Sequence, residues 1–125
     1  MREFPSFRTE LQQLYLKLAK EIPGQMSGFS SLHKSALAAG ALSAKSKELI
    51  ALGIAIAARC EGCIAFHIHD SVKAGASHKE VLEAIGVAVL MGGGPAMVYG
   101  CEALAALEQF ESGTQASGGT SPEVR

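Results

Sequence analysis

Tryptophan is absent from this chain, and only two tyrosines occur among its 125 residues. Positive charge is scarce as well. Eleven Lys and Arg are set against twelve Asp and Glu, which leaves a formal net charge of −1, and the basic residues form no stripe. Nucleic-acid-binding domains are typically basic, with Lys and Arg gathered on one face. We therefore expect no nucleic-acid partner.

Two further absences concern location. The first ten residues, MREFPSFRTE, contain no long apolar segment of the kind found in signal peptides. The longest uncharged run, residues 84–101, contains GGGP, which would break a membrane-spanning helix in the middle. We expect a cytoplasmic protein without a membrane partner.

Apolar residues, by contrast, are plentiful for so short a chain. Hydrophobic residues make up 48% and charged residues 18%, which is enough to build one core and leave apolar surface over. Leftover apolar surface on a small domain indicates contact with further copies of the chain. We expect a single domain over residues 1–111, a homo-oligomer, and a flexible polar tail over residues 112–125.

Helix-breaking and helix-capping residues divide the chain into segments with helical periodicity. Ser43 is a candidate N-cap, Ser77 and Glu80 have capping-box spacing, and Gly75 fits the residue after a helix end. Further boundaries fall at Pro5, at IPG (22–24), at Gly40 and at GGGP (92–95). The pattern predicts an all-α fold of about six helices. The helix after Ser43 turns apolar all round, which predicts deep burial.

The stretch CEGCIAFH, residues 60–67, is the strongest chemical signal. On a helix beginning there, Cys60, Cys63 and His67 fall on one face, whereas His69 points the other way and is expected to be exposed. A helix N-terminus and a C-x-x-C partner both lower a thiol pKa, from about 8.5 toward ~3.5–7.5. In a cytoplasmic protein such a pair is more often redox-active or metal-binding than structural.

A zinc site is the main alternative to redox chemistry at this stretch. Cys60, Cys63 and His67 could supply three ligands and Glu48 a fourth. The chain has no second C-x-x-C or H-x-x-H pair, which a structural zinc site usually needs. We therefore predict neither a metal nor a cofactor. Two inert buried cysteines are the remaining possibility, and the third cysteine, Cys101, is expected to be a small core residue.

Glu48 is the candidate partner of His67. It precedes Cys60 by 12 residues, directly before the apolar run 49–58. If the chain doubles back near Arg59, Glu48 comes level with His67 and can orient its imidazole. A first-turn acid that merely favours the helix dipole is the alternative.

Glu48, Cys60, Cys63 and His67, with the flanking segments KELIALGIA and GASHKEVLEAIGVAVLMGGGPAMVYG, resemble the core of the AhpD-like alkylhydroperoxidases in the carboxymuconolactone decarboxylase superfamily. The resemblance covers residues 42 to 107. It implies an all-helical fold that assembles as a homo-trimer or homo-hexamer. It also implies reduction of alkyl hydroperoxides and re-reduction by a dithiol partner, either lipoyl-bearing or thioredoxin-like.

The resemblance assigns roles residue by residue. It implies that Cys63 attacks the peroxide, that Cys60 resolves the sulfenic acid, and that Glu48 and His67 relay protons. Helix electrostatics alone would instead favour Cys60, nearer the helix start, as the more activated thiol. Gly62 departs from the family, which has a histidine at this position in AhpD.

Other functions remain open at this stage. A lactone decarboxylase would need acid–base groups but no C-x-x-C pair, and a non-catalytic redox-sensing oligomer would need the pair without turnover. We expect a peroxidase whose apolar surroundings, including Ile64 and Phe66, suit an alkyl group.

Overall fold

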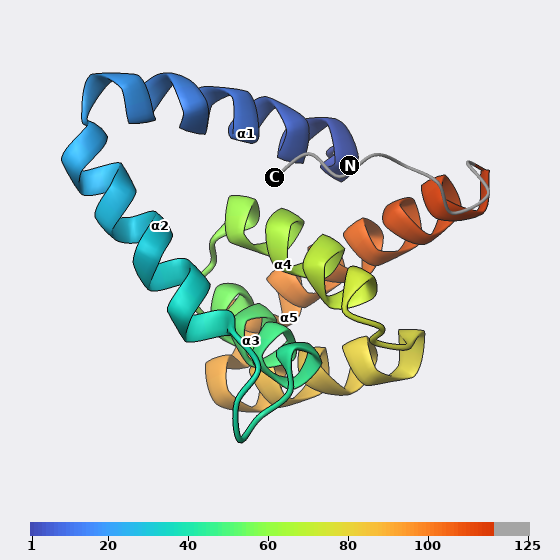
Figure 1. The fold of residues 1–125 in the computed structure, drawn as a ribbon. Coiled ribbons are helices and arrows are strands. Elements are labelled where there is room, and N and C mark those ends of the chain that lie inside the picture. The colour runs from blue at the N-terminus through green and yellow to red at the C-terminus, as the bar shows by residue number, and fades with distance from the viewer. Residues whose placement is uncertain (117–125) are drawn as a thin grey trace.

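The computed structural model describes residues 1–116, and these fold into helices joined by short turns, with no strand among them (Figure 1). The elements are α1 (Phe4–Glu21), α2 (Pro23–Leu37), α3 (Ala44–Ala57), α4 (Glu61–Lys73) and α5 (His78–Ala116). Gly93, at φ 70°, breaks α5 into two helical parts. The prediction of an all-α fold with about six helices is confirmed, since α5 counts as two.

The helix ends follow the capping residues of the sequence. Ser43 caps α3, accepting a hydrogen bond from the Ser46 backbone N–H at 3.0 Å. Ser77 and Glu80 form the reciprocal capping box before α5, at 3.1 Å and 2.8 Å. The bond from the Ser77 N–H and the nearby Lys45 ammonium lower the pKa of Glu80. Gly75, at φ 96°, ends α4 in the left-handed conformation that glycine favours.

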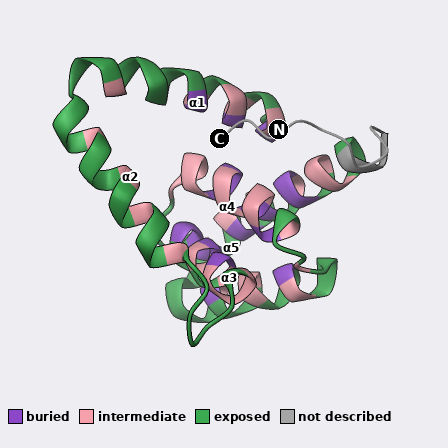
Figure 2. Cartoon of the chain, viewed as in Figure 1, coloured by how far each residue is buried: buried purple, intermediate pink, exposed green. Residues whose placement is uncertain are grey.

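The core lies where α3, α4 and the two parts of α5 meet, and the first three turns of α1 close it from above (Figure 2). Its fully buried side chains include Leu52, Ile56, Ile64, Ile68 and Leu107. On α1 the buried residues Phe4, Arg8 and Gln12 recur every four positions, so one stripe of that helix faces the core.

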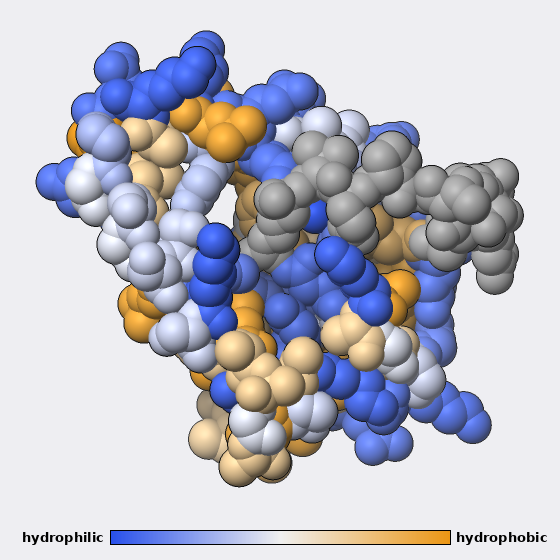
Figure 3. Space-filling model, viewed as in Figure 1, coloured by the Kyte–Doolittle hydropathy of each residue, from blue (hydrophilic) through white to orange (hydrophobic). Residues whose placement is uncertain are grey.

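The rest of α1, residues 13–21, and the whole of α2 form a projecting segment that we call the arm. No residue of α2 is buried, although Phe29 and Leu32 are large and apolar. Figure 3 shows hydrophobic, orange atoms on the surface of the arm. The arm therefore gains little stability from the core of its own chain.

The prediction that the second half of α3 is buried all round is wrong for the single chain. Leu52, Ala55 and Ile56 are buried, but Ile54 is 64% exposed. Most of the large apolar side chains of α5 are exposed too, namely Leu82, Val87, Leu90, Met91, Met97, Val98 and Leu104. In both α3 and α5, one apolar face therefore lies in the core and another is exposed to solvent in the single chain.

By length and composition, α5 could cross a membrane over His78–Gly113. The break at Gly93 and the carboxylates Glu102, Glu108 and Glu111 argue against a continuous span. α5 continues to Ala116, beyond the predicted domain end at residue 111. The remainder of the predicted tail, residues 117–125, lies outside the described residues.

Gln109 holds the first helix to the last. Its side-chain oxygen accepts a hydrogen bond from the Phe4 N–H at 2.7 Å, and its side-chain NH₂ donates to the Arg2 carbonyl at 3.0 Å. The two bonds satisfy one backbone N–H at the start of α1, where no intrahelical partner exists. They also join the start of α1 to α5.

Candidate active site

A tight turn between α3 and α4 places the first cysteine. Ala58 ends α3, and Arg59 takes the left-handed conformation at φ 60°. The Arg59 N–H donates to Ile56 O at 3.1 Å and the Cys60 N–H to Ala55 O at 3.0 Å, which is the Schellman pattern of a helix end. Cys60 is therefore tied to the end of α3 and begins α4 at once.

The two cysteines form a disulfide across the first turn of α4. Cys60 is the N-cap residue, and its sulfur accepts a hydrogen bond from the Cys63 N–H at 3.2 Å. The two Cα atoms lie 5.2 Å apart, within the range disulfides require, and Cys63 keeps its place in the helix. The pair can therefore open and close without unwinding α4. Both residues are partly exposed, so a reductant can reach them.

His67 and Glu48 are paired one turn beyond Cys63. His67 Nδ1 lies 2.8 Å from Glu48 Oε1, and the two side chains are only 16% and 12% exposed. The predicted proximity of Glu48 and His67 is confirmed, because α3 and α4 run back along each other from the Arg59 turn. A neutral His67 that donates from Nδ1 to the carboxylate presents Nε2 as a proton acceptor.

Helix α1 covers the position between the two cysteines. A Cβ atom added at Gly62 would lie 2.9 Å from Leu11 Cδ1, so a larger residue requires Leu11 to move. Arg2 binds Glu61 at 3.0 Å, and the Arg8 guanidinium lies 5.6 Å from the centre of the Phe66 ring. Leu11 thus occupies the space that a side chain at position 62 would need.

Two carboxyl groups meet at the start of α4. Glu102 of α5 lies beside Glu61, and burial together with the Glu61 charge raises the pKa of Glu102. Arg2 opposes this shift through its positive charge. The cysteine-bearing turn therefore borders a pair of acids that share hydrogen bonding, with an arginine on their other side.

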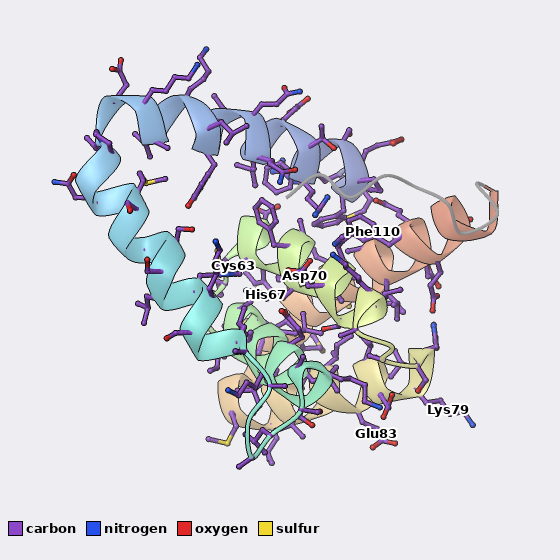
Figure 4. The ribbon with its side chains drawn as sticks, viewed as in Figure 1. Cys63, His67, Asp70, Lys79, Glu83 and Phe110 are labelled. Atoms are coloured by element: carbon purple, nitrogen blue, oxygen red, sulfur yellow. A yellow bond between two sulfur atoms is a disulfide. The ribbon has the colours of Figure 1, made fainter. Side chains whose placement is uncertain are left out.

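Asp70 is a site residue that the sequence analysis missed. It lies one turn beyond His67, so that Cys63, His67 and Asp70 follow one another along α4 (Figure 4). Ligand atoms of Glu48, His67 and Asp70 lie within 4.8 Å of one another. The spacing of Cys63, His67 and Asp70, at i, i+4 and i+7, was the signal that could have found it.

A cavity of about 300 Å³ opens beside these carboxylates. Six residues line it, four of them polar or charged: His33, Ala44, Glu48, Asp70, Lys73 and Ala74. The expected apolar surroundings differ: Ile64 is fully buried in the core, and neither Ile64 nor Phe66 lines this cavity.

Two other expectations are wrong. His69 is not exposed: its side chain is 19% exposed, it pairs with Asp70 at 2.9 Å, and its ring meets Phe110 edge to face. Cys101 is exposed, not buried in the core. Both errors have the same cause: a sequence pattern shows which residues share a helix face, but it does not show which face points to the core.

Known proteins share this fold and sequence. The family model for the carboxymuconolactone decarboxylase family matches residues 23–108, which excludes α1. An uncharacterized protein from Cupriavidus necator is 34% identical over 97 residues, covering 78% of this chain and 86% of its own. A second relative, encoded in the cox locus of Paracoccus denitrificans, is 36% identical over 83 residues, covering 66% of this chain and 75% of its own.

Two solved structures agree with these matches. The apo form of a carboxymuconolactone decarboxylase family protein from Legionella pneumophila is 47% identical with a TM-score of 0.83, covering 86% of this chain and 96% of that one. A Thermotoga maritima family member, for which a part in the antioxidative response has been suggested, is 26% identical with a TM-score of 0.72, covering 85% and 96%. On both sequence and structure, the chain belongs to the carboxymuconolactone decarboxylase family.

Proposed function

We propose that this protein is a thiol-dependent peroxidase that reduces hydroperoxides through Cys60 and Cys63. The observation that carries the proposal is the disulfide across the first turn of α4, with the Glu48–His67 pair one turn further on. A catalytic dithiol needs two sulfurs that bond without rearranging the chain and a group that moves protons beside them. Both requirements are met on one face of α4.

The first step is attack of the Cys63 thiolate on the distal oxygen of the hydroperoxide. The O–O bond breaks, Cys63 becomes a sulfenic acid, and the alkoxide takes a proton and leaves as the alcohol. His67, four residues further along the same face, is placed to remove the thiol proton and to deliver it to the alkoxide. Glu48 holds His67 in the tautomer this needs, through the 2.8 Å bond to Nδ1.

The second step closes the disulfide. The Cys60 sulfur attacks the sulfenic sulfur, and the oxygen leaves as water. The Cys63 N–H, which donates to the Cys60 sulfur at 3.2 Å, favours negative charge on that atom. This contact supports Cys60 as a thiolate both when it resolves and when the disulfide is reduced. A dithiol, lipoyl-bearing or thioredoxin-like, then restores both thiols by exchange and is itself oxidised to a disulfide.

The proposal includes the setting of the reaction. We place the enzyme in the cytoplasm, where thiols are kept reduced. We also propose a homo-trimer or homo-hexamer, supported by the exposed apolar side chains of α3, α5 and the arm.

Anaerobic stopped-flow of the reduced protein with cumene hydroperoxide tests the chemistry. We expect saturable peroxide loss with a Cys60–Cys63 bridge located by mass spectrometry. Cys60→Ser should accumulate a trappable sulfenic acid on Cys63, whereas Cys63→Ser should form none. A rate no faster than that of a free thiol would exclude a peroxidase and leave redox sensing. The reverse pattern in the two serine variants would exchange the roles of the cysteines.

Glu48→Gln tests the relay separately. Loss of general acid–base catalysis costs about 10²–10⁴-fold in rate, and we expect a fall in that range. Glu83→Gln, an exposed change on α5, is the matched control and should leave the rate unchanged. Wild-type rates in Glu48→Gln would remove Glu48 from the mechanism while leaving the two cysteines in it.

The lactone decarboxylase activity that names the family is the second candidate. It is favoured by the cavity, in which Lys73 offers a positive group to a carboxylated lactone. Turnover of such a lactone by the Cys60→Ser/Cys63→Ser variant would support this activity over the peroxidase.

A further inference from the structure

Three side chains of types that can ligate a metal ion lie close together on two helices. Glu48 comes from α3, and His67 and Asp70 come from successive turns of α4. Their ligand atoms lie within 4.8 Å of one another, and each side chain is at most 16% exposed. Two carboxylates and an imidazole held this closely are costly to keep together unless positive charge lies among them.

The cavity beside this cluster has room for an ion and its water. Glu48 and Asp70 both border the 300 Å³ space, in which a water molecule would take a share of about 30 Å³. Glu48 is a buried residue, 9% exposed, and its hydrogen bond to His67 uses Oε1. Its second oxygen therefore remains available to a ligand in the cavity. Asp70 uses Oδ1 toward His69, on the neighbouring face of α4.

We propose that Glu48, His67 and Asp70 bind one divalent first-row transition-metal ion, such as Zn²⁺ or Co²⁺, with water completing the coordination. One imidazole and two carboxylates are ligands that these ions accept, and three protein ligands plus water is a common arrangement. Neither cysteine is needed, which separates this site from the zinc site that the sequence could suggest. It also departs from the sequence-based prediction that the chain has no metal ligand.

The charged groups around the cavity bear on the charge of the ion. Lys73 borders the cavity and opposes a cation, but it lies exposed at the last turn of α4, where a long side chain can extend into water. His33 borders the cavity from α2, and His69 contacts Asp70. Glu48 and Asp70 therefore place two carboxylates on the cavity wall, against the ammonium of Lys73.

Metal binding would compete with the relay. His67 Nδ1 and Glu48 Oε1 share a proton at 2.8 Å, and an ion bound by both atoms displaces that proton to solvent. This regulatory consequence rests on the proposed peroxidase function, whereas the binding itself does not. Zn²⁺ should then slow peroxide reduction by the wild-type protein more than by Asp70→Asn, which keeps both thiols and lacks one ligand of the site.

The test uses the full chain with all three cysteines changed to serine, because thiolates bind the same ions. Calorimetry with Zn²⁺ and the visible absorption of Co²⁺ should show one ion per chain. Asp70→Asn in this background should weaken binding at least tenfold, and Glu83→Gln should not change it. Broadened or shifted His67 imidazole resonances on adding Co²⁺ to the cysteine-free parent give a second readout, in case Asp70→Asn fails to fold.

Three outcomes would overturn the proposal: no binding by the cysteine-free protein, equal binding after Asp70→Asn, or Co²⁺ effects that spare His67. Binding as expected without any effect of Zn²⁺ on wild-type peroxide reduction would keep the site and remove its regulatory role. Binding as expected in a protein with no peroxidase activity would keep the site and refute the proposed function alone.

Discussion

Helices α2 and α4 are of similar length but are stabilised in different ways. α4, with 13 residues, buries Ile64, Ala65, Ile68 and Ser71, whereas α2, with 15 residues, buries none. α4 carries the cysteines, His67 and Asp70, and α3, which carries Glu48, packs against it. The proposed reacting groups thus lie on well-packed helices, and the arm consists of helix that its own chain leaves largely uncovered. This difference teaches that the packing of this fold is concentrated around the Cys60–Cys63 disulfide.

The largest expected effect tests this contrast directly. Ile68→Ala removes a fully buried side chain and should destabilise the chain by about 2–5 kcal/mol in urea unfolding. Leu32→Ala on the arm, where the side chain is 61% exposed, should change stability by no more than ~0.5 kcal/mol at low protein concentration. A larger loss for Leu32→Ala that grows with protein concentration would show that another copy covers the arm. Equal losses at low concentration would refute the contrast.

An intermediate effect is expected where α1 changes from core helix to arm. Gly62→His should force Leu11 aside and cost about 1–3 kcal/mol, as overpacking does. Leu11→Ala in the same chain should recover part of this loss, because the methyl groups that clash are removed. A Gly62→His protein as stable as wild type would mean that Leu11 moves aside without cost, and that this part of α1 is packed as loosely as the arm. The double variant also places the histidine of AhpD between the cysteines, so its peroxide rate reports what Gly62 changes.

The smallest expected effect concerns Glu102. Its pKa is raised, so the folded state holds the proton more tightly than the unfolded state, and stability falls as pH rises from the ordinary glutamate range through the raised pKa. Glu102→Gln should therefore raise the melting temperature slightly at pH 7 and have no such effect at about pH 3, where Glu102 is protonated in both states. Glu21→Gln at the end of α1 is the control on the arm, and it should change neither value. A melting temperature lowered by Glu102→Gln at pH 7 would contradict the assigned direction.

Much of the fold could be predicted from the sequence because local signals mark its helix ends. Ser43, Gly75 and the Ser77–Glu80 box act within one turn of chain, and the structure uses each as expected. The end of α3 was harder, since Arg59 adopts the conformation usually taken by glycine. The Glu48–His67 pair could be predicted because the tight turn at Arg59 joins α3 directly to α4. Residues at similar distances before and after that turn therefore lie side by side.

What could not be predicted depends on contacts distant in sequence or outside the chain. The hydrophobic periodicity of the sequence cannot predict that Leu11 approaches Gly62, because two other helices separate α1 from α4 in the chain. Ile54 and Cys101 were expected inside because their segments are apolar, yet in the single chain both face outward. Asp70 was missed although it lies on the same face of α4, one turn beyond His67.

The hydrogen bonds of Gln109 have a consequence for biosynthesis. Phe4 and Gln109 are 105 residues apart, so these bonds of the first helix can form only when nearly the last one has been made. At roughly 5–20 residues per second, the start of α1 waits on the order of 5 to 20 seconds for Gln109. Until then the Phe4 N–H has to be satisfied by water, and slowing the ribosome late in the message would lengthen that interval.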